Sequence, residues 1–314
     1  MEAAKVYAGV DVAKDGLELW LRPSGEHRSY ANDRRGIAAL RGRLAELGCE
    51  RIVLEASGGY ETLVASSLWD AGLPVLVVNP RWVRDYGRSI GQLAKTDRLD
   101  ARLLAQYAEH AELELRELPD AQTRALKELC ARREELLEMM GAERNRLEHA
   151  SKALRRRIER HVDYLRKQLA QIEHDIDQAI KNSPLWSDQR ALLRSVPGVG
   201  PVLCSALLAR LPELGRLNRG EVAKLVGVAP LNHDSGQLRG IRMIAGGRAA
   251  LRRALYMSAF AAIRHNPPLR TYYEQLRARG KPFKVALVAA MRKLIIILNA
   301  MLKTNSPWRP PCPA

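Results

Sequence analysis

The first third of the chain is a series of short apolar runs separated by amphipathic segments. Residues 5–13 alternate with a period of two, because Val6, Ala8, Val10 and Val12 are separated by Tyr, Gly and Asp, and this period predicts a β-strand. Further strands are expected at residues 16–21, 27–31, 51–56 and 74–78, and helices at residues 37–47, 61–70 and from Asp97 onward. Three strands followed by alternating helices and strands predict an α/β domain over residues 1–115.

The apolar positions of residues 120–182 follow a seven-residue repeat instead. The repeat is carried by Ile158, Val162, Leu165, Leu169, Ile172 and Ile176. It predicts a coiled-coil arm with one helix from Ala142 to Lys181. The apolar side of this helix needs a partner, which is either Thr123–Met140 folded back on it or a second copy of the chain. The basic run Arg155–Arg157 is either an exposed helix face or a contact for phosphates.

The last third is predicted to be mostly helical over residues 186–305, with a proline-rich tail at residues 306–314. Within it, the segment Val196-Pro-Gly-Val-Gly resembles a helix-hairpin-helix element. In such an element, Gly198 and Gly200 expose backbone N–H groups at a helix start to a phosphate. A tight turn between helices that binds no ligand is the alternative.

The most apolar segment, Phe283–Leu302, is interrupted by Arg292 and Lys293. We therefore expect a buried or DNA-facing helix there and no membrane span. The four cysteines are scattered and show neither the spacing of a zinc site nor a disulfide framework. Because no signal peptide is expected either, the sequence predicts a cytoplasmic protein.

Positive charge is concentrated in the last third of the chain. The whole chain has 51 Lys and Arg against 35 Asp and Glu, a net charge of +16. Residues 215–314 hold 18 of these basic residues and only 3 of the acidic ones, so they carry nearly all of the net charge. A field of one sign over one domain is typical of proteins that bind nucleic acid or an anionic membrane surface.

Four carboxylates fall at positions from which they can meet. Asp11 lies near the end of the first strand and Glu55 on the fourth, while Asp97 and Asp100 are three residues apart on one helix. Acids gathered at one place repel one another, and Mg²⁺ favours their ionised form. All four are therefore predicted to be Mg²⁺ ligands, and the helix face that begins at Asp97 is expected to be buried. The alternative is that Thr96 caps the helix and Asp97 only favours its positive end.

The order of strands, helices and acids resembles the ribonuclease H-like fold, in its Holliday-junction-resolvase branch. Farther along the chain come the predicted arm, the Val-Pro-Gly-Val-Gly segment, Ser235 in Asp-Ser-Gly, and Gly246-Gly-Arg before Arg-Ala-Leu-Tyr. In this order and spacing, the motifs look like those of the DEDD transposases of insertion sequences, the bridge-RNA-guided recombinases. The resemblance spans residues 6–302.

The resemblance implies that Ser235 is the nucleophile and that it forms a phosphoserine linkage with DNA beside Mg²⁺. It also implies a transposase that acts on donor and target DNA, guided by a non-coding bridge RNA, as a tetramer in the bacterial cytoplasm at the nucleoid. The guanidinium groups expected to hold phosphates are those of Arg239, Arg242, Arg248 and Arg252. Contacts to DNA without sequence preference are the alternative for these four arginines.

Two other interpretations of the sequence stay open. One is a Mg²⁺-dependent structure-specific endonuclease of the same fold that activates water. In that protein, Ser235 would be an ordinary turn residue before glycine. The other is a nucleic-acid-binding protein without catalysis, in which the four acids are structural.

Overall fold

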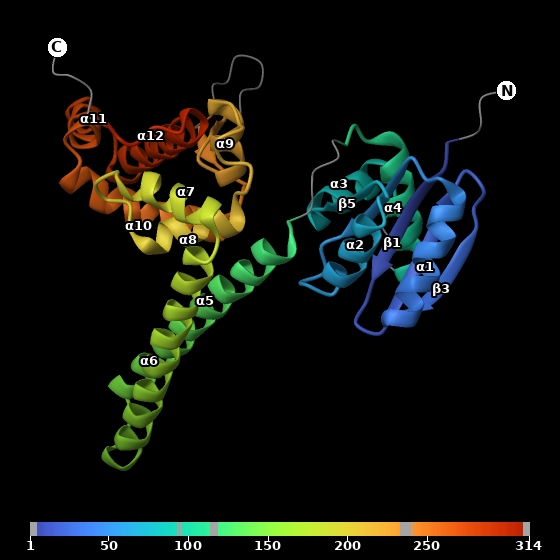
Figure 1. The fold of residues 1–314 in the computed structure, drawn as a ribbon, viewed down its shortest axis with the longest axis horizontal. Coiled ribbons are helices and arrows are strands. Elements are labelled where there is room, and N and C mark those ends of the chain that lie inside the picture. The colour runs from blue at the N-terminus through green and yellow to red at the C-terminus, as the bar shows by residue number, and fades with distance from the viewer. Residues whose placement is uncertain are drawn as a thin grey trace. The chain divides into compact units, whose positions relative to one another are not determined.

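The computed structural model describes residues 5–92, 94, 96–113, 119–232, 240 and 242–309. They form two compact units, Met1–Leu118 and Pro119–Ala314, of which the first is α/β and the second is mostly helical (Figure 1). The arm expected at residues 120–182 is part of the second unit. Its separation from a domain at residues 186–305 and a tail at residues 306–314 stays a prediction.

The first unit is built on a five-stranded sheet. Its strands are β1 (Tyr7–Val12), β2 (Gly16–Arg22), β3 (His27–Ala31), β4 (Arg51–Glu55) and β5 (Val75–Val78). Their order across the sheet is β3-β2-β1-β4-β5. The first three strands are antiparallel, and β4 and β5 run parallel to β1. The predicted strands are thus confirmed, with ends that differ by one or two residues.

Helices cover both faces of this sheet. The helices of the first unit are α1 (Arg34–Leu47), α2 (Glu61–Asp70), α3 (Pro80–Ser89) and α4 (Asp97–His110). Because side chains alternate along a strand, Ala8 and Val10 of β1 pack into one buried cluster with α1 and α2. Val53 of β4 points the other way and packs with α3 and α4. Odd-numbered residues of β1 and β4 therefore face α4.

Helix α3 was not predicted from the apolar pattern, since Val83 and Gly87 are its only buried residues. It begins at a clear polar start signal. The side chain of Asn79 accepts a hydrogen bond from the backbone N–H of Arg81 at 2.9 Å, and Pro80 occupies the first helical position. Asn-Pro at the end of a strand was therefore the signal that could have located this helix.

The second unit contains eight described helices and a short hairpin. They are α5 (Ala121–Glu148), α6 (Lys152–Lys181), α7 (Pro184–Arg194), α8 (Pro201–Arg210), α9 (Arg219–Val226), β6 (Pro230–Leu231), β7 (Met243–Ile244), α10 (Ala249–His265), α11 (Pro267–Ala278) and α12 (Phe283–Thr304). The strands β6 and β7 are antiparallel. The mostly helical character expected for the last third is confirmed.

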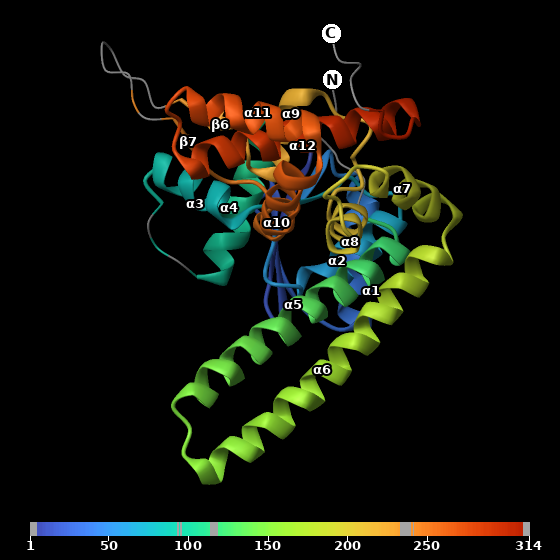
Figure 2. The same cartoon turned by 90° about the vertical axis from the view of Figure 1, so that its left-hand side faces the viewer.

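The single arm helix expected from Ala142 to Lys181 is wrong. The chain reverses at residues 149–151, and α5 and α6 pack along each other as a hairpin (Figure 2). Leu136 and Met140 of α5 bury themselves against Leu165 of α6. The partner of the apolar seam is therefore the folded-back segment of the same chain. The reversal contains neither glycine nor proline. The sequence therefore contains no sign that the helix predicted from Ala142 is interrupted there.

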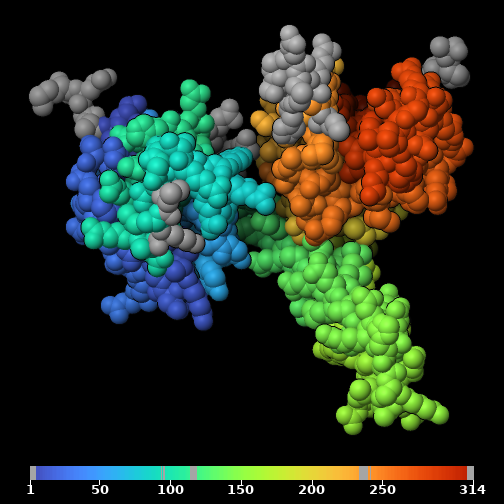
Figure 3. All heavy atoms as spheres, turned by 180° about the vertical axis from the view of Figure 1, so that it is seen from behind, coloured from blue at the N-terminus to red at the C-terminus, as the bar shows by residue number. Residues whose placement is uncertain are grey.

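Both helices of the arm end in the same packed base. Leu126 near the start of α5 and Ile180 at the end of α6 share a buried cluster with Trp186 of α7 and Leu208 of α8. From this base, the arm extends away from the remaining helices of its unit (Figure 3). The run Arg155–Arg157 lies on the exposed surface of the arm.

Helix α12 forms the centre of the second unit's core. Its buried positions recur at helical spacing and are Ala286, Leu287, Ala290, Met291, Leu294, Ile295, Leu298 and Met301. Among the described helices, α12 alone is long and apolar enough to cross a membrane, but its apolar face is packed against the other helices of the unit. This packing is what a core helix requires, as the interrupting Arg292 and Lys293 led us to expect.

Candidate active site

A glycine in β1 allows α4 to lie directly on the sheet. A Cβ atom at Gly9 would lie 2.3 Å from both the carbonyl oxygen of Ala101 and the backbone nitrogen of Ala105. No side chain fits in that space, so Gly9 is required for the close approach of helix and strand. The first turn of α4, with Asp97 and Asp100, is thereby brought to the end of β1.

Strand register brings two further carboxylates to the same edge. Val10 of β1 is paired with Leu54 of the parallel strand β4. Asp11 and Glu55 each follow directly, and by alternation both are on the α4 face. Neighbouring strands are about 5 Å apart, so the two carboxylates start from adjacent backbone positions.

The charges of the four acids act on one another. Burial raises the pKa of Asp11, and the negative charges of Asp100, Asp97 and Glu55 raise it further, to about 6. A backbone hydrogen bond from Val12 opposes this shift only weakly. The structure thus brings the sequence-predicted acids into one electrostatic group.

The two acids of α4 differ in exposure. Asp100 is half-buried, whereas Asp97 is exposed, so the expectation that the face beginning at Asp97 is buried is wrong for its first residue. The continuous buried face begins at Ala101. Thr96 does cap the helix, because its Oγ1 accepts a hydrogen bond from the backbone N–H of Leu99 at 3.2 Å. Capping and metal binding by this turn are compatible roles.

The loop that follows Glu55 is held by a half-buried carboxylate that was not among the predicted site residues. Glu61 Oε2 accepts hydrogen bonds from the backbone N–H and hydroxyl of Ser57, both at 3.0 Å, and from the N–H of Gly59 at 2.8 Å. Burial raises the pKa of Glu61, but these hydrogen bonds outweigh burial and leave its pKa lowered. Glu61 therefore stays ionised and fixes the backbone beside Glu55.

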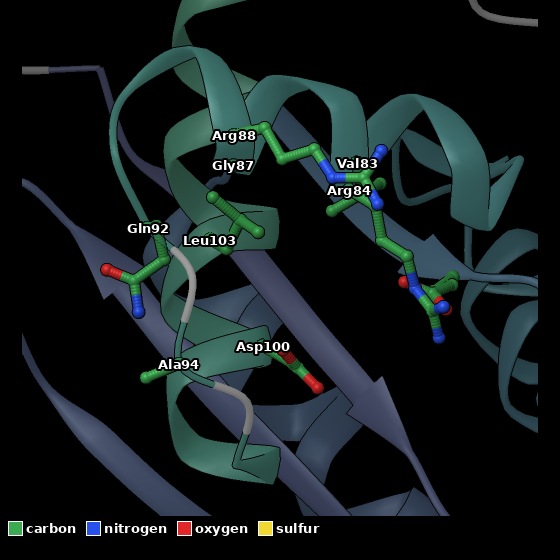
Figure 4. A pocket seen from close by; sticks show the side chains of 9 residues that line it. Val83, Arg84, Gly87, Arg88, Gln92, Ala94, Asp100 and Leu103 are labelled. Atoms are coloured by element: carbon green, nitrogen blue, oxygen red, sulfur yellow. The ribbon is translucent and has the colours of Figure 1, made fainter.

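A pocket of about 210 Å³ opens between β4, α3 and α4. Glu55 and Asp100 line it together with Arg84, Arg88 and Gln92. Figure 4 shows Asp100 pointing into the pocket from α4 while Arg84 and Arg88 extend along its α3 side. The pocket combines acidic and basic side chains at the edge of the sheet where the four acids gather.

The donor set of this edge fits a divalent cation. Carboxylate oxygens are the ligands that Mg²⁺ and similar hard cations prefer, and a bound cation would relieve the repulsion that raises the pKa of Asp11. Among the described residues, no three His, Cys, Asp or Glu side chains already stand together as a coordination shell. The charges of the other three acids act on Asp11, but the carboxylate groups of these described residues do not converge on one point as metal ligands would.

The predicted nucleophile, Ser235, lies outside the described residues, as does Arg239. The chain leaves β6 at Leu231 and re-enters β7 at Met243, so the serine is carried by the connection of this hairpin. Arg242, at the end of that connection, is exposed.

Two glycines fix the base of the hairpin. A Cβ atom at Gly247 would lie 2.3 Å from the backbone nitrogen of Gly227, which ends α9. The neighbouring Arg248 N–H donates to Leu225 O at 2.8 Å. The end of α9, the glycine pair and the start of α10 are therefore locked together.

Two of the predicted phosphate-binding arginines have internal contacts. The guanidinium of Arg248 forms a bidentate ion pair with Glu213, at 2.6 and 2.9 Å, and donates to Arg210 O at 2.5 Å. Arg252 donates to Gly246 O at 2.5 Å. Their contact with nucleic acid stays a prediction, while the structure assigns both a role in bracing the start of α10.

The predicted helix-hairpin-helix glycines lie between α7 and α8. Gly198 has a φ of +95°, and a Cβ there would come within 2.5 Å of Ala262 in α10, so this glycine is required by packing alone. Gly200 is the residue before α8, has open space around its Cα, and leaves the first N–H groups of α8 without a side-chain cap. Phosphate binding by this turn stays a prediction.

Comparison with known proteins identifies the class of enzyme. Residues 8–154 match the transposase family model of the DEDD IS110 type, and residues 190–274 match that of the transposase IS116/IS110/IS902 family. The two matches cover most of the chain. The chain therefore belongs to the IS110 family of transposases, which are enzymes that act on DNA.

Individual relatives extend this picture. The chain is 26% identical over 315 residues to the pilin gene-inverting protein of Moraxella bovis, with 97% of this chain and 98% of that protein covered. It is 32% identical over 152 residues to an uncharacterized 43.6 kDa protein of insertion element IS110 from Streptomyces coelicolor, with 48% of this chain and 36% of that protein covered. DEDD transposases are associated with divalent metal ions, in keeping with the oxygen donors of the acidic edge.

Proposed function

We propose that this transposase cuts and rejoins DNA through a covalent phosphoserine at Ser235. Asp11, Glu55, Asp97 and Asp100 would hold the divalent cation, which we take to be Mg²⁺. The observation that carries the proposal is the convergence of these acids at one edge of the sheet, through the register of β1 with β4 and the contact of α4 with Gly9. Burial and the charges of the other three acids together raise the pKa of Asp11 to about 6. Such a group of acids is poorly suited to a purely structural role.

The covalent step conserves the number of phosphodiester-type bonds. The hydroxyl of Ser235 gives up its proton, its Oγ forms a bond to a DNA phosphorus, and the bond from that phosphorus to a sugar oxygen breaks. The freed sugar oxygen takes up a proton. Rejoining is the reverse, with the hydroxyl of another strand end as the attacking group, so the reaction needs no ATP. A divalent cation, when bound, stabilises the negative charge on the attacking and leaving oxygens.

The finer features of the proposal rest on resemblance. The strand order and directions of the first unit support a ribonuclease H-like fold of the resolvase branch, and the paired helices α5 and α6 support a coiled-coil arm. The positive charge of residues 215–314 supports binding of donor and target DNA, of a guiding bridge RNA, and association with the nucleoid. Assembly as a tetramer follows from the family resemblance alone.

The pilin gene-inverting relative supports the same class of reaction. It aligns over nearly the whole length of this chain, and its name describes rearrangement of DNA within a gene. Because the enzyme class follows from family membership, a purely DNA-binding role is not retained. The structure-specific endonuclease that activates water is the remaining competitor.

The decisive experiment asks for the covalent adduct. Labelled DNA carrying the ends of the insertion element is incubated with the protein, the bridge RNA and Mg²⁺, denatured, and separated on a gel. Wild-type protein should retain label, and Ser235→Ala should lower that amount by roughly 10³-fold or more, as expected for a lost nucleophile. Ser258→Ala, a serine of α10, is the control and should behave as wild type.

Two results would contradict the proposal. Normal adduct formation by Ser235→Ala would disprove the nucleophile. Free cut ends in place of an adduct, made equally well by wild type and Ser235→Ala but lost in Asp11→Asn, would favour the endonuclease that uses water.

A further inference from the structure

Two arginines of α3 belong to the pocket that contains half of the acidic group. Arg84 and Arg88 line this pocket together with Glu55 and Asp100. They are four residues apart and therefore lie on one side of the helix. Figure 4 shows both side chains on the α3 side of the pocket. They were not among the residues singled out from the sequence.

The backbone places α3 at a fixed, short distance from α4. A Cβ at Gly87 would lie 2.9 Å from the Cδ2 atom of Leu103, so the small residue lets the two helices approach. Val83 on the same side of α3 is buried in the cluster with Leu104. Arg84 and Arg88 flank this contact, and their position relative to Asp100 is set by packing that does not involve the arginines themselves.

Neither arginine is committed to a strong ion pair. Arg88 pairs with Asp85 at 3.4 Å, but the two side chains are 73% and 69% exposed, and pairs of this kind contribute little. Arg84 forms no ion pair with any described residue. Both guanidinium groups are exposed and can therefore be offered to a ligand.

We propose that Arg84 and Arg88 bind a backbone phosphate of the DNA strand at the acidic site. The proposal rests on the function proposed above, because the carboxylates of the pocket must be neutralised by a cation before an anion can enter it. With that charge neutralised, two guanidinium groups remain, and each can hold a phosphate by two parallel hydrogen bonds. Arg84 and Arg88 are thus positioning residues that set where the strand lies.

DNA is favoured over RNA as the ligand because the pocket shares Glu55 and Asp100 with the site proposed to act on DNA. An RNA held at this position would occupy the place of the substrate. The ligand is therefore defined by its phosphodiester backbone and by its place at the cutting site. The contact carries no base information.

The test is cross-linking at the pocket in the full-length protein. Gln92, which lines the pocket, is replaced by benzoylphenylalanine, and a fluorescent single-stranded DNA oligonucleotide is irradiated with the protein in Mg²⁺ over a series of salt concentrations. Each phosphate contact contributes about 0.7 to the slope of log affinity against log salt for a single strand. The variant with Arg84→Ala and Arg88→Ala loses the contact with this one phosphate, so it should bind more weakly at this position, with a slope smaller by about 0.7.

Matched variants show whether the charge or the fold is responsible. Arg84→Lys with Arg88→Lys should keep most of the slope, since the charges remain. Arg41→Ala removes an exposed arginine of α1, on the other face of the sheet, and should change nothing. Circular dichroism melting should be the same for all of these variants.

The outcomes separate this proposal from the proposed function. An unchanged yield and slope in the double alanine variant would overturn the phosphate site, as would preferential cross-linking of an RNA oligonucleotide. Asp11→Asn should abolish DNA strand cleavage and, because it weakens cation binding, lower the yield of the cross-link while the remaining yield still depends on Arg84 and Arg88. If Asp11→Asn cleaved normally while the cross-link still depended on Arg84 and Arg88, the catalytic proposal would fail and the phosphate site would stand.

Discussion

The acidic edge of the first unit and the serine loop of the second are built in opposite ways. Each carboxylate sits on or next to a regular element, so its place follows from strand pairing and from the contact of α4 with Gly9. Ser235 is carried by the connection between two very short strands, and the described structure fixes only the base of that connection. A site on regular elements can be located from periodicity, whereas a site on a loop needs a recognisable motif.

The largest expected effect removes the contact that creates the acidic edge. Gly9→Ala places a Cβ against two backbone atoms of α4, and overpacking of this kind should lower the free energy of unfolding of the first unit by about 3 kcal/mol. Adduct formation should be lost with it. The control is Gly42→Ala in α1, where a Cβ meets nothing within 4 Å. Urea unfolding followed by circular dichroism measures both, and equal stabilities would show that α4 does not need the glycine.

The second effect tests how the loop is held. Gly246 and Gly247 have nearly the same φ, +67° and +68°, but only Gly247 would bring a Cβ against Gly227. Gly247→Ala should therefore be less stable than Gly246→Ala by about 2 kcal/mol, because backbone strain is equal and only the clash differs. Paired urea titrations give the difference. Indistinguishable variants would mean that the hairpin base is not locked to α9.

A smaller effect uses the pH dependence of Asp11. Its pKa of about 6 in the folded protein exceeds the ordinary value of 3.8 for aspartate, so the folded state binds the proton more tightly. The metal-free protein should then lose stability as pH rises from about 4 to 6, by about 1.5 kcal/mol after allowance for partial exposure. Asp11→Asn should remove this loss. Melting temperatures at both ends of the range, without divalent ions, measure it.

Adding Mg²⁺ gives a second comparison of the wild type with Asp11→Asn. At neutral pH the ion should raise the melting temperature of the wild type, because it binds the ionised carboxylates of the folded state. Asp11→Asn should respond much less. A pH-independent melting temperature, or an equal response of both proteins to Mg²⁺, would argue against a metal site at this edge.

The smallest expected effect concerns the start of α4. Thr96→Ala removes the side-chain acceptor for Leu99 N–H and should cost about 1 kcal/mol of stability. Thr271→Ala, on the exposed surface of α11, serves as the comparison and should be neutral. If Thr96→Ala also reduced adduct formation strongly, the orientation of Asp97 and Asp100 would depend on the cap.

Much of the first unit could be predicted because β1 and β2 alternate between apolar and other residues, while β4 and β5 are short apolar runs. The strand positions follow from these patterns, and the placement of Asp11 and Glu55 on one face follows from the alternation of side chains along a strand. The exposure of Asp97 could not be predicted, because it depends on where along α4 the contact with the sheet begins. That point is set by Gly9, and nothing in the local sequence says which helix will cross a given glycine.

The misses in the second unit have a different cause. The reversal at residues 149–151 has no glycine or proline, and α5 and α6 are both good helical sequences, so only the packing of one against the other shows where the chain turns. Helix α3 was not predicted because its apolar face is short, so its arginines could not be placed beside the acids. The roles of Arg248 and Arg252 as internal braces depend on Glu213 and Gly246, which only the fold brings to them.

The hairpin form of the arm makes its length independently adjustable. Since α5 leaves and α6 returns at one packed base, seven residues added to each helix would move the tip outward by about 10 Å and keep the apolar seam in phase. No residue of either site would change. Insertions at the turn would therefore change the length of the arm without moving either site. Related recombinases with arms of different length could in this way span different distances.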